Sequence, residues 1–382
     1  MKTVLHLVLA AVIFQLQASS QTVSTVVPGP STFNDGLDID MEGNIYASDY
    51  FGTTVTKITP AGNTSIFASG FSSPNGLKFG PDGFLYVPSV NTNKISKVSL
   101  SGTVSDYLTI SNPAELFFDS DGLLYVANYT NSTISTVDTA KNITVLFSGT
   151  PLNGPIGVLK DSAGTLYIGN FTDGKVFRID NGTDFVEIGD LPSWLGFMIL
   201  VGDNIYATAY QTHRIYKIPI DGSGQSIFAG TGSPGNTDGN VLSAQFNNPN
   251  GITATSTGDT FYVSEYTPRR LRMITGVLNP TSVSDDEKNI NDFELFQNYP
   301  NPFNPETNIK YSINSRQLVT LKVYNVLGGE VATLVNEEKP AGKYEIEFKV
   351  GQDSSPDIAS GVYFYRLNAG SFMKTRKMII LK

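Results

Sequence analysis

A segment that recurs six times between Phe33 and Ile274 places the strongest constraint on the fold of this chain. Each copy has a glycine-containing lead-in, an apolar strand that ends in tyrosine, and a second strand that ends in an aliphatic residue. A period of about 40 residues kept over so many copies predicts a repeat architecture. The tyrosines are Tyr46, Tyr86, Tyr125, Tyr167, Tyr206 and Tyr262, and twelve residues after them stand Ile58, Val98, Val137, Ile179, Ile218 and Ile274.

Each copy predicts four antiparallel strands. In the second copy the strands are expected at 76–79, 84–89, 94–100 and 103–108, with a Pro-Asp-Gly turn after the first. Residues 22–27 resemble the fourth strand of the other copies, whereas the sixth copy stops at Ile274 without one. Because an open sheet edge is a liability, we expect residues 22–27 to complete the last copy. The predicted fold is an all-β, six-bladed β-propeller over residues 21–277.

Composition excludes several classes of function. The net charge of −9 and the pI of about 4.8 argue against a nucleic-acid partner. The chain has no cysteine, so it has neither disulfides nor thiolate metal sites. Its two histidines, His6 and His213, are too few for a multi-histidine zinc site.

The N-terminus has the pattern of a secretory signal peptide at residues 1–20. Lys2 precedes an apolar run from Val4 to Leu16, which is too short to span a bilayer, and small residues follow it. The mature chain is therefore expected to start at Gln21. The sequence contains no other apolar run of transmembrane length, and the protein is expected to be exported.

The pattern changes after a polar, breaker-rich linker at 278–292. From residue 293 to 382, apolar and polar residues alternate in several short runs, for example at 319–324, 344–350 and 362–367. Alternation of this kind predicts half-buried antiparallel strands. We expect a small immunoglobulin-like β-sandwich.

Two family resemblances extend this interpretation. The segments 228–232, 238–239 and 244–252, together with His213-Arg214-Ile215, resemble NHL-repeat propellers and the neighbouring SMP-30/gluconolactonase-like propellers. This resemblance implies the propeller fold, but such propellers include enzymes, scaffolds and binding proteins, so it fixes no function.

The C-terminal region resembles the type A sorting domain of the type IX secretion system. The resemblance rests on Asn298–Pro305, on Ser360–Leu367 and on Thr375–Met378. It implies export through the periplasm, passage across the outer membrane by the type IX machinery, and release or surface attachment, with the domain removed or retained. The expected sorting-signal residues are Gly361, Tyr363, Arg366, Arg376 and Lys377.

Two rings of residues are predicted at one mouth of the propeller channel, because the loops that carry them lie on the same face. The first ring precedes the lead-in glycine, at Asp35, Asn75, Ala114, Ile156, Leu195 and Asn250. The second ring lies three residues after the tyrosine, at Asp49, Ser89, Asn128, Asn170, Ala209 and Glu265. Oxygen-bearing side chains gather on copies six, one and two, while copies four and five are mostly apolar and add Trp194. Glu115 stands where the other copies have glycine.

These rings leave two interpretations open. Asp35, Asn75, Asn250 and Glu265 could hold Ca²⁺ or another divalent cation, the cofactor that the gluconolactonase resemblance implies, with Asp35 or Glu265 as a catalytic base. Alternatively, the Asp and Asn side chains brace loops through local hydrogen bonds. The remaining ligand-binding candidates are Asp49, Ser89, Glu115, Asn128, Asn170 and Trp194.

The predicted function is a secreted or cell-surface propeller that binds a carbohydrate, peptide or protein at the channel mouth. The alternative is a secreted, metal-dependent lactonase or esterase. Aromatic residues recur four positions after the tyrosine and predict either packing between blades or a rim that stacks on sugar rings. We expect a monomer. The recurring aromatics are Tyr50, Tyr129, Phe171, Tyr210 and Tyr266.

Overall fold

The computed structural model describes residues 21–40, 42–119, 121–277, 294–298, 301–313, 317–340, 342–350, 358–370 and 372–380. The predicted signal peptide, 1–20, and the predicted linker, 278–292, lie outside these ranges. The chain divides into two compact units, Met1–Thr281 and Ser282–Lys382. In the described part of the chain, no helix has the length and apolarity needed to cross a membrane.

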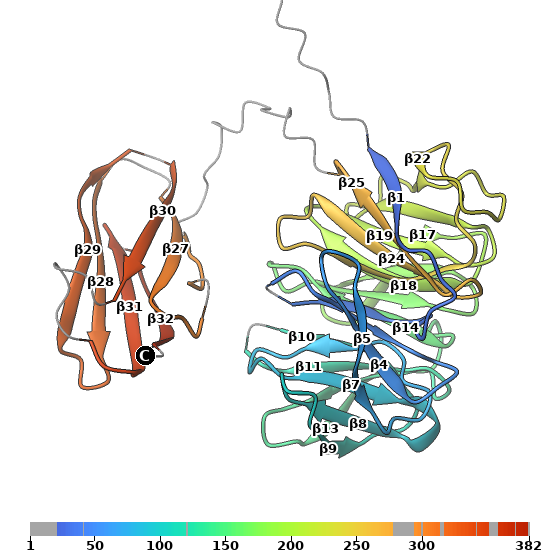
Figure 1. Ribbon diagram of the computed structural model, residues 1–382, viewed down its shortest axis with the longest axis horizontal. Coiled ribbons are helices and arrows are strands. Elements are labelled where there is room, and N and C mark those ends of the chain that lie inside the picture. The colour runs from blue at the N-terminus through green and yellow to red at the C-terminus, as the bar shows by residue number, and fades with distance from the viewer. Residues whose placement is uncertain are drawn as a thin grey trace, which may run out of the picture. The chain divides into compact units, whose positions relative to one another are not determined.

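The first unit consists of six antiparallel sheets, here called blades one to six, and most of them are built from consecutive strands (Figure 1). Blade one contains β2 (Leu37–Ile39), β3 (Ile45–Ser48), β4 (Thr54–Ile58) and β5 (Thr64–Ser69). Blade two contains β6 (Lys78–Phe79), β7 (Leu85–Ser89), β8 (Lys94–Val98) and β9 (Val104–Thr109). Blade three contains β10 (Pro113–Phe118), β11 (Leu124–Asn128), β12 (Thr133–Val137) and β13 (Ile143–Ser148). A short 3₁₀ turn, η1 (Val90–Thr92), follows β7.

Blades four and five repeat this order, and blade six departs from it. Blade four contains β14 (Pro155–Lys160), β15 (Leu166–Asn170), β16 (Lys175–Asp180) and β17 (Asp184–Asp190), and blade five contains β18 (Leu195–Val201), β19 (Asn204–Ala209), β20 (Arg214–Pro219) and β21 (Ser226–Ala229). Blade six has the strand order β22 (Gly239–Asn240), β1 (Thr22–Val27), β25 (Arg270–Thr275), β24 (Thr260–Glu265) and β23 (Pro249–Ala254).

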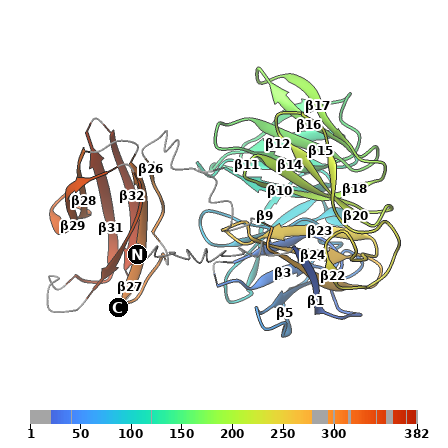
Figure 2. The ribbon, with the colours of Figure 1, turned by 90° about the horizontal axis from the view of Figure 1, so that it is seen from above.

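The N-terminal strand β1 therefore belongs to the sheet formed by the end of the unit. Val23 lies opposite Ile274, and Thr22 lies opposite Thr275. Figure 1 shows β1, in blue, beside β25, and Figure 2 shows it near β22, with which it also pairs. Because β1 and β25 are about 250 residues apart in the sequence, this pairing joins the first residues of the unit to its last blade.

The repeated residues form the interior of the blades, as their spacing predicts. The six aliphatic residues that follow the tyrosines by twelve positions are at most 5% exposed. Several of the tyrosine hydroxyls also fix the turn between the first two strands of their blade. The Tyr46 hydroxyl donates to Asp40 at 3.0 Å, and the Tyr86 hydroxyl donates to Asp82 at 2.9 Å. The tyrosine thus combines apolar packing with a hydrogen bond at its polar end.

The second unit is formed by two sheets around one core. One sheet has the order β26 (Glu294–Leu295), β27 (Glu306–Ile313) and β30 (Gly342–Lys349). The other has the order β29 (Glu330–Lys339), β28 (Gln317–Asn325), β31 (Gly361–Ala369) and β32 (Phe372–Ile380). Buried residues of both sheets, such as Ile309 and Leu321, belong to one hydrophobic cluster, which the alternating sequence pattern predicts.

Candidate ligand site at the channel mouth

A cavity of about 200 Å³ is formed by the loops that enter the first strand and leave the second strand of the blades. In five blades an aromatic residue stands just after the second strand, and this position delivers a ring to the cavity. Every blade contributes to the wall, as expected for the mouth of a propeller channel. The lining residues are Asp35, Tyr50, Asn75, Val90, Tyr129, Ile156, Phe171, Trp194, Tyr210, Asn250 and Tyr266.

The polar part of the cavity comes from blades six, one and two. The side-chain amide of Asn250 donates to Asp35 Oδ1 at 2.5 Å, and Asn75 Oδ1 accepts from the backbone N–H of Gly76 at 3.0 Å. Asp35 is 3% exposed. Burial raises the pKa of Asp35 to about 8, with a smaller contribution from Asp49, while the hydrogen bond from Asn250 opposes the shift. The Asp35 carboxyl is therefore mostly protonated at neutral pH and can donate a hydrogen bond.

The apolar part of the cavity is a continuous arc of aromatic rings over blades three to one. Trp194 is at its centre and is 40% exposed. Its ring stacks on that of Phe171, with an interplanar angle of 26°. The arc is interrupted at blade two, where Val90 takes the place of an aromatic residue. Along the arc the ring centroids are 5.7 Å apart for Tyr129–Phe171, 5.3 Å for Phe171–Trp194, 6.1 Å for Trp194–Tyr210, 5.4 Å for Tyr210–Tyr266 and 6.4 Å for Tyr266–Tyr50.

The second predicted ring does not line this cavity, because its side chains turn back to the loops behind the wall. Asn128 donates to the carbonyl of Ser111 at 2.6 Å, and Asn170 donates to the carbonyl of Pro151 at 2.9 Å. Ser89 Oγ accepts from the N–H of Ser72 at 3.4 Å. Asp49 lies 3.5 Å from the guanidinium of Arg269. These contacts are the bracing that the second interpretation of the sequence describes.

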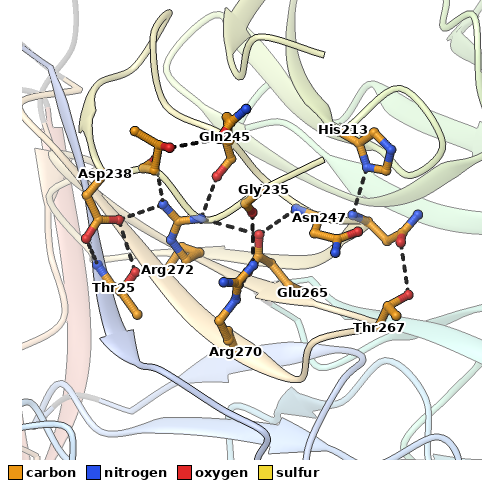
Figure 3. Close-up of polar contacts among 12 residues, drawn as sticks. Thr25, His213, Gly235, Asp238, Gln245, Asn247, Glu265, Thr267, Arg270 and Arg272 are labelled. Atoms are coloured by element: carbon orange, nitrogen blue, oxygen red, sulfur yellow. Dashed lines mark hydrogen bonds and ion pairs between the residues drawn. The ribbon is translucent and has the colours of Figure 1, made fainter. Parts of the chain in front are cut away.

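Glu265 belongs to a buried arginine cluster in blade six, which Figure 3 shows. Its Oε2 accepts from Arg270 at 2.6 Å, and its Oε1 accepts from Arg272 at 3.3 Å. Burial raises the pKa of Glu265, while Arg272 and Arg270 oppose the shift. Arg272 also reaches Asp238 at 2.6 Å, and Asp238 accepts from the backbone N–H and the hydroxyl of Thr25 at 3.0 Å each. The cluster thus connects β1 to the rest of blade six.

The predicted metal ligands therefore separate into two places. Asp35, Asn75 and Asn250 meet at the cavity, whereas Glu265 is held by arginines. Within the described residues, no group of three or more His, Cys, Asp and Glu side chains is placed to hold a metal ion. Ca²⁺ takes about six to eight oxygen ligands. One carboxyl that bonds an amide N–H and has a raised pKa does not fit such an ion.

The other candidate residues lie apart from the mouth. Glu115 lines a second cavity of unit one. His213 is not among the residues that line the mouth cavity, and its Nδ1 accepts from the N–H of Asn248 at 3.0 Å. Burial lowers the pKa of His213. It therefore acts as a neutral acceptor that holds the loop before β23.

The predicted sorting residues lie on the last two strands of the second unit. Gly361 begins β31, Tyr363 is buried in the core, and Arg366 lies with its guanidinium 5.0 Å from the Tyr324 ring centroid. Arg376 Nε donates to the carbonyl of Leu295 at 3.0 Å.

The two motifs that mark the start and the end of the sorting domain are in contact. The Lys377 carbonyl accepts from Gln297 at 2.7 Å, and the N–H of Ile379 donates to Asn301 Oδ1 at 2.7 Å. The hydroxyl of Tyr365 donates to the Phe296 carbonyl at 2.8 Å. The last strands of the unit are therefore fixed against its first residues.

Six antiparallel sheets that surround a cavity, followed by a separate β-rich unit, define a β-propeller with an appended domain. The chain belongs to the virginiamycin B lyase family, which matches residues 5–267. Residues 297–381 match the secretion system C-terminal sorting domain. The type IX sorting domain expected from the sequence is thus confirmed, and it indicates secretion and attachment to the cell surface.

Two solved structures with TM-scores above 0.5 confirm the fold. An auxiliary nutrient binding protein from Bacteroides ovatus is 14% identical, with 68% of this chain and 77% of that chain covered and a TM-score of 0.58. A gluconolactonase from Xanthomonas campestris is 12% identical, with 66% and 89% covered and a TM-score of 0.54. A virginiamycin B lyase from Staphylococcus aureus is 19% identical, with 65% and 82% covered and a TM-score of 0.49. No curated protein matches the chain.

The structure places at the site one set of residues for which the sequence left two roles open. The aromatic residues that follow the second strands were predicted either to pack between blades or to form a rim, and they do both. Their rings contact one another across blades and also line the cavity. The signal was their recurrence four positions after the tyrosine in five copies. Of the six ligand-binding candidates other than the predicted metal ligands, only Trp194 lines the mouth.

Proposed function

We propose that this protein is a secreted or surface-attached binding propeller whose channel mouth takes up a carbohydrate. The observation that carries the proposal is the aromatic arc that faces a polar wall of Asp35, Asn75 and Asn250 in one cavity. Ligand sites of this kind are mostly apolar and place a few polar groups that fix orientation. A sugar matches both halves, since its C–H faces pack on aromatic rings while its hydroxyls need hydrogen-bond partners.

The size of the cavity limits what enters it. A cavity of about 150 Å³ in another protein holds a benzene molecule, and the mouth cavity here measures about 200 Å³. One ring therefore fits, which favours a terminal sugar over a folded protein surface. A peptide could enter only by one side chain. The chain's structural neighbours include a nutrient binding protein, which supports the proposal at the level of the fold.

Asp35 sets the polarity of the site. A protonated Asp35 is neutral and presents a donor, so a neutral ligand with acceptor oxygens suits it better than a cation. Raising the pH through about 8 ionises this group. We expect affinity for the ligand to fall above that pH. Titrations at about pH 6 to 9 check this, and the Asp35→Asn variant should show a flatter profile because it retains a donor.

Trp194→Ala should weaken carbohydrate binding by about 1 to 2 kcal/mol, or roughly five- to thirtyfold, because it removes the centre of the aromatic arc. The binding sugar is first found on a glycan array, and its affinity is then measured by calorimetry. Phe51→Ala is the matched control, since Phe51 is 64% exposed and contacts Tyr266 without lining the cavity. Equal loss in both variants would contradict the proposed site.

Family membership suggests a second candidate function, lyase activity. The gluconolactonase neighbour suggests a third, lactone hydrolysis. Neither is favoured by the site, because Asp35 is the only carboxyl among its lining residues and no group of three or more His, Cys, Asp and Glu side chains in the described residues is placed to hold a metal ion. Incubation with virginiamycin B, and a lactone and aryl-ester screen with and without chelator, tests both. Turnover that Asp35→Asn abolishes would make the mouth an active site and replace the binding proposal.

The route of export is the remaining part of the proposal. The signal peptide delivers the chain to the periplasm, and the sorting domain passes it to the type IX machinery. Deleting residues 361–382 removes β31 and β32, which contact the start of the domain. We expect the deleted protein to stay in the periplasm on fractionation, while Phe51→Ala is exported normally. Deleted protein at the cell surface would contradict this route.

A further inference from the structure

A second cavity, of about 440 Å³, lies at the other end of the channel of unit one. The residues that line the mouth precede the first strands of the blades. The residues that line this second cavity, here called the lower cavity, lie toward the ends of those strands. Lys78 of β6, Lys160 of β14 and Val201 of β18 are among its lining residues. The proposed function does not use this cavity.

Glu115 is the residue that breaks the repeat at this place. The other five blades carry glycine at the start of the first strand, at Gly36, Gly76, Gly157, Gly196 and Gly251. These glycines allow neighbouring blades to approach closely, since a Cβ on Gly36 would lie 2.6 Å from the Cα of Gly76. Blade three instead has Glu115, whose Oε2 lies against Gly76 of blade two. Blade three therefore carries a carboxyl at the position where the other five blades have glycine.

Phe197 closes the channel from the opposite side. A Cβ on Gly76 would lie 2.8 Å from Cε1 of Phe197, so this ring reaches the same glycine as Glu115. Both residues line the lower cavity and neither lines the mouth. Together they separate the two cavities, and Glu115 belongs to the lower one.

The charges around the lower cavity are balanced except at Glu115. Lys78 lies 2.9 Å from Asp38, and Lys160 lies 3.0 Å from Asp119. Glu115 Oε2 is buried and has no hydrogen-bond partner among the described residues. Burial raises the pKa of Glu115 well above its usual range, Lys78 opposes the shift, and Asp38 and Asp35 add to it. The Glu115 carboxyl also accepts from the backbone N–H of Leu116, so Oε2 alone lacks a partner. An unpaired buried oxygen is costly, and a group that donates to it would remove the cost.

The wall formed by blade five is apolar. The last residues of β18, Ile199, Leu200 and Val201, are only half-buried although they are aliphatic. The corresponding end of blade one carries Asp38, and that of blade four carries Lys160. The lower cavity thus joins an aliphatic wall to a carboxyl whose Oε2 has no hydrogen-bond partner among the described residues.

We propose that the lower cavity binds a small organic cation, a primary ammonium with an aliphatic chain. The ammonium donates to Glu115, and the chain packs on the end of β18. An anion is disfavoured because both lysines already have carboxylate partners. This site is distinct from the carbohydrate site and does not depend on it.

Calorimetric titration of the full chain with n-hexylammonium at neutral pH tests the proposal. We expect saturable binding, because the ammonium supplies the hydrogen-bond donor that Glu115 Oε2 lacks among the described residues. Hexanoate, the matched anion, should not bind, and n-hexylammonium should leave the emission of Trp194 in the mouth unchanged.

Two different substitutions of Glu115 are tested, so that a folding defect in one of them does not decide the result. Glu115→Gln removes the charge, and Glu115→Gly restores the residue that the other five blades carry. Both should weaken n-hexylammonium binding at least about tenfold. Absence of binding to the unaltered chain, unchanged affinity in both variants, or hexanoate binding as tightly as the amine would overturn the proposal.

Discussion

Glu265→Gln should destabilise the propeller by roughly 3 to 5 kcal/mol, because it removes the charge that compensates two buried arginines. The side chain of Arg272 is fully buried, and that of Arg270 is 10% exposed. The introduced amide still offers Arg270 an acceptor oxygen, beside the Gly235 carbonyl at 2.9 Å, but it carries no negative charge. Asp238 would remain beside Arg272, but its side chain is 46% exposed and it compensates the charge less well.

Chemical unfolding followed by tryptophan emission measures this effect in the propeller alone, since Trp194 is the one tryptophan of the chain. The control is Glu187→Gln, which removes an ion pair with Lys175 whose side chains are 42% and 37% exposed. An exposed pair contributes about 0 to 1 kcal/mol. If the two variants lose the same stability, the cluster does not hold blade six together.

Asp35→Asn should stabilise the propeller, and the gain should grow with pH. The pKa of Asp35 is raised from 3.8 to about 8, so the folded state holds a proton that the unfolded chain releases between those values. The free energy of unfolding is therefore highest below about pH 4, where Asp35 is protonated in both states. It decreases as the pH rises toward about 8, because the unfolded chain then loses the proton that the folded state holds. One such proton changes stability by up to about 1.4 kcal/mol per pH unit.

Unfolding curves for the two proteins at about pH 4.5, 6 and 7.5 check the prediction. The stability difference should be small at the lowest pH and reach a few kcal/mol at the highest. The amide introduced by Asp35→Asn keeps an acceptor oxygen for the Asn250 N–H, so the substitution removes the charge with little change in shape. A difference that is independent of pH would show that Asp35 is ionised in the folded protein.

The repeated residues made the fold predictable. Tyr46 and Ile58 recur at the same spacing in every copy, and this spacing predicts the strands. The sixth copy lacks a last strand, which indicates that residues 22–27 complete it. The sheet pairs Val23 with Ile274, which local sequence alone could not specify because the two residues are far apart in the chain. The motif at Asn298 and the one at Tyr363 identified the sorting domain without any structural information.

The site was less predictable because neighbouring positions in a loop point in different directions. Asn128 and Tyr129 are adjacent, yet the amide braces a loop while the phenol ring lines the cavity. Glu265 also has the residue type of a metal ligand, but Arg270 and Arg272 are its partners, and their proximity depends on the pairing of β24 with β25. Residue type identified polar positions, and only the fold showed which of them share a cavity.

The most direct test of the carbohydrate site is a titration of the full chain with the sugar selected on the array, followed by the emission of Trp194. Trp194 is the only tryptophan in the sequence and lines the proposed site. The proposal predicts a saturable change in emission whose midpoint agrees with the calorimetric affinity. Binding that is visible by calorimetry but leaves the emission of Trp194 unchanged would place the ligand elsewhere and contradict the proposed function.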